Sequence, residues 1–138
     1  MKFVPDNHSG LRIHGYGTGL LKLALPSGIV TELPYDHETG LHQVTQSIIL
    51  SGQGLICNWP PATLAQLTME HIDIISSLEP ELVLLGTGAR LQFPVSEILA
   101  PLHQRGIGLE IMDTAAACRT FNILMSEGRK VAAALLIN

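Results

Sequence analysis

Two segments in the second half of the chain carry side chains that could bind an anion. The first is Gly86-Thr87-Gly88-Ala89-Arg90, where glycines let a backbone approach an anion closely and Arg90 could pair with it. The segment lacks the Gly-Lys-Ser/Thr of a phosphate-binding loop and the six-residue dinucleotide fingerprint. A tight turn that needs positive φ would explain the same glycines without a ligand, so both interpretations stay open.

The second segment begins with Asp113 and Thr114, which precede a predicted helix. The first amides of a helix attract anions, unless a capping carboxylate already occupies them. Arg119 and Asn122 lie three residues apart and therefore share one helix face. If that face borders a crevice, the pair forms a polar pocket with Thr87; if it faces inward, the side chains satisfy buried backbone groups instead.

Other reactive side chains lack partners at a useful spacing. None of the six histidines is three or four residues from another, and Cys57 and Cys118 are far apart, so we expect no metal site. No Gly-x-Ser-x-Gly occurs, and Ala117 and Phe121 favour a buried Cys118 over a nucleophilic thiolate. We therefore predict no catalytic residue and no cofactor, and we favour a non-enzymatic protein over an enzyme.

The composition supports a well-filled core and a protein partner. Of the 138 residues, 46% are hydrophobic and 14% are charged, which leaves apolar surface for a partner protein or for self-association. A net charge of −4 without a long basic run argues against nucleic acid. With no signal peptide and no apolar run near the roughly 20 residues that span a bilayer, we expect a cytoplasmic protein without membrane insertion. Trp59, beside two prolines, is either an interface anchor or a lid over the core.

The elements that position these side chains differ between the two halves. Residues 1–10 are expected to be a flexible N-terminus and residues 11–138 a single α/β domain. Up to about Asn58, apolar alternation and turn residues predict strands. The predicted strands are 11–16, 20–25 and 29–33, and the last two form a hairpin through Pro26-Ser27-Gly28. Residues 47–50 and 55–57 are predicted to form either a second hairpin or one bulged strand.

The second half alternates apolar runs with helical patterns. We predict strands at 82–85, 107–112 and 130–137, and helices at 68–78, 94–104 and 113–127. Pro101 should kink the middle helix or delay its start. This order predicts a three-layer α/β fold, in which a mixed central β-sheet has helices on its faces and an N-terminal antiparallel β-hairpin region. Because carboxyl ends of parallel strands meet at one rim, segments 86–90 and 113–122 are expected to share a crevice there.

The same residues carry a family resemblance. Its motifs are Leu84-Leu85-Gly86-Thr87-Gly88, the run from Gly106 to Leu124, Glu127-Gly128-Arg129 and Val131-Ala132-Ala133-Ala134-Leu135. This chain resembles the small domain family of unknown function that includes mitochondrial complex I assembly factor 3. The resemblance implies a three-layer α/β fold and a non-enzymatic protein-binding module, an assembly factor for a respiratory or other complex. The alternative is a small-molecule or anion-binding protein that uses the crevice at the strand ends.

Overall fold

The computed structural model describes residues 10–17 and 19–138, so the expected flexible N-terminus lies, except for Gly10, outside the described residues. The first part of the chain forms an antiparallel sheet with the strand order β1-β2-β4-β3. Its strands are β1 (Arg12–Gly17), β2 (Leu20–Ala24), β3 (Tyr35–Asp36) and β4 (Leu41–Val44).

A second, five-stranded sheet is the mixed sheet that the sequence predicts. Its strands are β5 (Ile48–Ser51), β6 (Gly54–Ile56), β7 (Leu82–Gly86), β8 (Gly108–Met112) and β9 (Val131–Leu135), in the order β6-β5-β9-β7-β8. β7 is parallel to both β8 and β9, while β5 is antiparallel to β9 and to β6. The chain therefore leaves β7 for a neighbour on one side and then returns to its other side.

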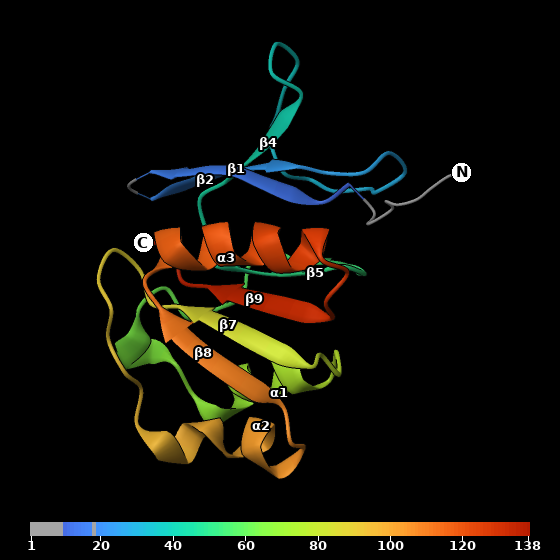
Figure 1. Cartoon of the computed structure of the whole chain (residues 1–138). Helices are drawn as coiled ribbons and strands as arrows, with labels where there is room; N and C mark the ends of the chain where they lie inside the picture. The colour runs from blue at the N-terminus through green and yellow to red at the C-terminus, as the bar shows by residue number, and fades with distance from the viewer. Residues whose placement is uncertain (1–9, 18) are drawn as a thin grey trace.

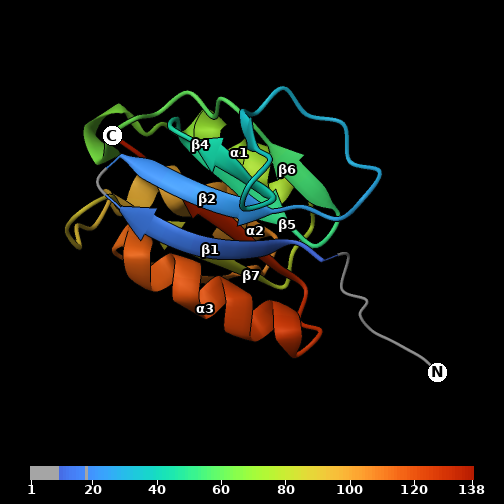
Figure 2. The ribbon, with the colours of Figure 1, turned by 90° about the horizontal axis from the view of Figure 1, so that it is seen from above.

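Helices cover both faces of this sheet. The helical segments are η2 (Leu64–Gln66), α1 (Met69–Ser76), η3 (Ser96–Leu99), α2 (Ala100–Gln104) and α3 (Thr114–Ser126). Helices α1 and α2 lie on one face, while α3 and the four-stranded sheet cover the other, with α3 running next to β1 (Figures 1 and 2). The late start of α2, with Pro101 in its first turn, confirms the expected effect of that proline.

One predicted hairpin is wrong. β2 pairs with β1 on one side and with β4 on the other, and residues 29–33 form no strand. Gly28 does turn the chain, with φ of +93°, but Val30 behind it is 98% exposed, so no alternating apolar face follows the turn. The partner of β2 is instead β4, whose sequence Leu-His-Gln-Val carries little strand signal.

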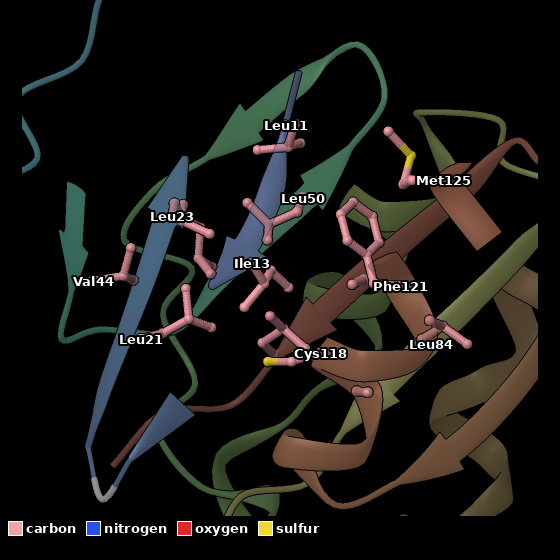
Figure 3. Packing of buried hydrophobic residues seen from close by; sticks show 14 of the residues in the cluster. Leu11, Ile13, Leu21, Leu23, Val44, Leu50, Leu84, Cys118, Phe121 and Met125 are labelled. Atoms are coloured by element: carbon pink, nitrogen blue, oxygen red, sulfur yellow. The ribbon is translucent and has the colours of Figure 1, made fainter. Parts of the chain in front are cut away.

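The five-stranded sheet separates two hydrophobic cores. Alternate residues of β7 supply both, because Leu84 faces α3 and the small sheet while Val83 and Leu85 face α1 and α2. Figure 3 shows the first core, where Phe121 of α3 lies among side chains from both sheets. This packing holds the carboxyl ends of β7, β8 and β9 at one rim.

Candidate functional site

The structure brings the two predicted segments together at this rim. The amide of Thr87 donates to the carbonyl of Met112 at 2.9 Å, and the amide of Thr114 donates to the carbonyl of Gly88 at 2.9 Å. The last strand joins them, since the amide of Leu136 donates to the carbonyl of Gly86 at 2.9 Å. The ends of β7, β8 and β9 thus form one hydrogen-bonded junction.

Thr114 is the centre of this junction. Its buried hydroxyl donates to the carbonyl of Leu136 at 2.9 Å and accepts from the amide of Gly88 at 2.8 Å. Gly86 lets Thr114 approach, because a Cβ at that position would lie 3.0 Å from both Cα and Oγ1 of Thr114. Gly88 has φ of +97°, the backbone conformation that the turn interpretation required. Because the amide of Gly88 already donates to the hydroxyl of Thr114, it is not available to bind an anion.

Asp113 occupies the N-terminus of α3. Its carboxylate accepts from the amide of Ala116 at 2.8 Å, which is the capping bond that the sequence allowed. The negative charge of Asp113 itself therefore lies where an external anion would interact with the helix dipole.

Thr87 and Arg90 border a groove of about 760 Å³, which we call the rim groove. The hydroxyl of Thr87 donates to the carbonyl of Arg90 at 2.7 Å and accepts from the amide of Gln92 at 3.2 Å, which fixes the start of the loop. The groove is lined by Thr63, Leu64, Ala65, Leu67, Thr87, Ala89, Arg90, Gln92, Phe93, Pro94, Val95, Ile98 and Asn138. It opens where the chain order reverses around β7, the place where open α/β sheets commonly bind ligands.

Arg119 and Asn122 lie at a second groove, of about 320 Å³, between β1 and α3. We call it the β1–α3 groove. The amide side chain of Asn122 accepts from the backbone N–H of Ile13 at 2.9 Å and donates to its carbonyl at 2.7 Å. This is the backbone-pairing alternative that the sequence left open for Asn122, whereas Arg119 is exposed. The predicted residues are thus divided between a junction and two grooves, and ligand binding by them stays a prediction.

Sequence reasoning missed three side chains that line the β1–α3 groove. Arg12, His14 and Tyr16 belong to β1 and line the groove together with Arg119 of α3. The signal that could have found two of them is the alternation of a strand at 11–16, which puts Arg12 and His14 on one face. No local pattern shows which helix that strand lies beside, because the contact joins residues more than one hundred positions apart.

Burial controls the protonation of two groups at this groove. It is the largest cause that raises the pKa of Tyr16, and smaller electrostatic contributions from Cys118 and Asp113 act in the same direction. Burial likewise raises the pKa of Cys118 to about 12, against a smaller lowering by Arg119. Both groups therefore keep their protons at neutral pH, and Cys118 is a neutral thiol rather than a nucleophile.

The raised pKa of Cys118 predicts slow alkylation. At pH 8 only about one in ten thousand of its thiols is ionised, so iodoacetamide should label half-buried Cys57 well before Cys118. Mass spectrometry of the intact and digested chain measures both rates, with a Cys57→Ser variant isolating Cys118. Equal Cys118 rates in the folded chain and in urea would contradict the assignment.

Trp59 packs in the core on the α1 side of the sheet. Its side chain is 2% exposed, and its indole N–H donates to the carbonyl of His71 at 3.3 Å. Trp59 therefore covers the core as a lid, and almost none of its indole surface is accessible to a partner. Within residues 10–17 and 19–138, no group of three metal-binding side chains gathers, and no helix has the length and apolarity to cross a membrane.

Fold and grooves together define a small mixed α/β protein with one groove at a rim of its central sheet and another between β1 and α3. The chain belongs to the family described as "Protein of unknown function (DUF498/DUF598)", whose model matches residues 36–136. This confirms the family resemblance seen in the sequence motifs.

Two similar proteins of known structure confirm the fold. A Bordetella parapertussis protein of known crystal structure is 31% identical, with a TM-score of 0.76 over 94% of this chain and 98% of that chain. A Xanthomonas campestris protein solved by NMR is 48% identical, with a TM-score of 0.64 over 70% of this chain and 73% of that one.

Among curated relatives, zebrafish "NADH dehydrogenase [ubiquinone] 1 alpha subcomplex assembly factor 3" is 42% identical over 83 residues, 59% of this chain and 48% of that protein. The chain therefore spans about half the length of that relative. A Francisella tularensis relative, 33% identical over 66 residues (48% of this chain and 54% of that protein), is named "13 kDa major membrane protein".

Proposed function

We propose that this chain is a protein-docking module that binds its partner through residues 89–95, at the edge of the rim groove. The observation that carries the proposal is a run of exposed apolar side chains in this segment. Leu91 is 52% exposed, Phe93 is 68% exposed and Val95 is 65% exposed. A cluster of this kind on a chain with few charges favours an interaction site.

The segment is held in place before any partner arrives. Thr87 bonds it at Arg90 and Gln92, and Pro94 limits the backbone that follows. A fixed loop loses less conformational entropy on binding than a free one. Phe and Arg are also residue types that are enriched in protein interfaces.

The chemistry of the segment describes the partner. Phe93 and its apolar neighbours fit an apolar side chain, and Arg90 at the same groove fits an acidic residue next to it. We therefore propose an apolar segment with an adjacent carboxylate on another protein. The assembly factors among the relatives make a subunit awaiting assembly the first partner to test, with respiratory complex subunits foremost. A second copy of this chain is the competing occupant.

Site-specific cross-linking tests this function. A photoreactive residue at position 93, expressed in the native host, should capture one defined protein that mass spectrometry identifies. With that partner purified, Phe93→Ser should weaken binding by about 30-fold or more, the loss expected of a central aromatic anchor. The matched control is Ile123→Ser, which changes another exposed apolar side chain, 57% exposed, on α3.

Three results would count against docking through this segment. The first is cross-linking to no single, reproducible protein, and the second is an equal loss of binding in the two variants. The third is cross-linking only to copies of the same chain, which would indicate self-association instead.

A cytoplasmic location and the lack of nucleic-acid binding stay predictions from the sequence. Cell fractionation tests the location directly, since one relative is named as a membrane protein.

A further inference from the structure

Basic side chains from two distant parts of the chain meet at the β1–α3 groove. Arg12 and His14 of β1 and Arg119 of α3 line it. The other lining residues are Ile13, Gly15, Tyr16, Ala115, Cys118 and Asn122, so no Asp or Glu of the described chain is among them. In a protein of net charge −4 with only 8 Lys and Arg, this is a local concentration of positive charge.

A β-bulge shapes the strand side of the groove. The register of β1 with β2 passes from the Ile13–Leu23 pair to the Gly15–Lys22 pair, so His14 is one extra residue in the strand. Ile13 and Tyr16 can therefore both pack toward the core, while His14 and Gly15 lie exposed between them. Bulges often redirect side chains next to functional sites. Space is open at Gly15, where a Cβ would meet nothing within 4 Å.

Asn122 fixes the distance between the two walls. Because its side chain bonds both backbone groups of Ile13, β1 cannot move away from α3 without breaking two hydrogen bonds. Arg119 lies one helical turn before Asn122, on the same face. These bonds therefore fix the width of the groove and the backbone positions of Arg12, His14 and Arg119.

One acidic group lies near the groove but outside its lining. Asp113 is close enough to raise the pKa of Tyr16 and of Cys118, and its carboxylate, which accepts from the amide of Ala116, offsets part of the positive charge of the groove. Cys118 is a neutral thiol, and Tyr16 keeps a proton that it can donate. The groove thus offers two guanidinium groups, an imidazole and a phenol, with no competing acid in its lining.

We propose that the β1–α3 groove binds the phosphate group of a small phosphomonoester, with Arg12 and Arg119 pairing with its oxygens and His14 beside them. Guanidinium groups match the geometry of phosphate oxygens with paired N–H donors. A volume of about 320 Å³ suits a small molecule rather than a large cofactor. The site is separate from residues 89–95 and does not depend on the docking function.

NMR titration of the whole chain tests the proposal, with inorganic phosphate and phenyl phosphate as probes and acetate as a monoanion control. Both phosphates should produce saturable shifts at the amides of residues 12–16 and 115–122, and acetate should produce weaker ones. Arg119→Gln and Arg12→Gln should each raise the dissociation constant by about 10-fold or more. Arg90→Gln, which removes an exposed arginine of the rim groove, should leave it unchanged.

Several outcomes would overturn the site. One is the absence of saturable shifts in those two segments up to the solubility limit of the probes. Others are a response that survives in Arg119→Gln, equal losses in Arg119→Gln and Arg90→Gln, or acetate binding as tightly as phosphate. Phe93→Ser separates this proposal from docking, because it should weaken partner binding and leave the phosphate response intact.

Discussion

Replacing Thr114 with Val should lower the free energy of unfolding by about 2–6 kcal/mol. Valine has nearly the shape of threonine, but it cannot accept from the amide of Gly88 or donate to the carbonyl of Leu136. Both backbone groups would remain buried without a partner, at about 1–3 kcal/mol each. Denaturant unfolding followed by circular dichroism measures the loss.

Thr114→Ser is the matched control, since serine keeps the hydroxyl and loses only a methyl group. It should cost clearly less than Thr114→Val, and the amide of Gly88 should stay protected from hydrogen exchange in the serine variant alone. If valine left both stability and that protection unchanged, the junction of β7, β8 and β9 would not depend on Thr114.

Parts of this fold were predictable because their signals are local. Thr68 accepts from the amide of His71 three residues later, and Asp113 accepts from that of Ala116 at the same spacing. Gly128 ends α3 with φ of +75°. Each of these positions is set by residues within one turn, so a sequence pattern identifies it correctly.

Other parts of the fold depend on contacts between residues that are far apart in the sequence. The partner of β2 lies beyond a long loop, and a turn signal directly after β2 favoured the wrong hairpin. Asn122 binds the backbone of Ile13, 109 residues away, so its helix face alone could not show what it touches.

The same limit applies to the candidate sites. The meeting of the segments at Gly86 and Asp113 followed from parallel strand order, which the alternating pattern predicts. The assignment of Arg119 to a groove with Arg12 and His14 required the position of β1 on α3. A bulge at His14 also changes which side chains of β1 face the solvent, and the spacing of apolar residues does not reveal it.

Phe121→Ala should destabilise the chain by about 3–5 kcal/mol, a large share of the roughly 5–15 kcal/mol typical of whole domains. Phe121 is fully buried at 0% exposure, and it packs among side chains of both sheets on the α3 side (Figure 3). The surrounding side chains belong to several elements and cannot all collapse into the cavity. Thermal and denaturant unfolding measure the effect.

Two controls give this prediction its meaning. Phe121→Leu keeps most of the volume and should cost less than about 1.5 kcal/mol, while Ile123→Ala, on the exposed face of α3, should change stability by less than about 0.5 kcal/mol. Because α3 holds β1 through Asn122, the alanine variant should also speed hydrogen exchange in β1 before global unfolding. If Phe121→Ala lost little stability and the amides of β1 stayed protected from hydrogen exchange, the small sheet would be held by its packing against β5 and not by α3.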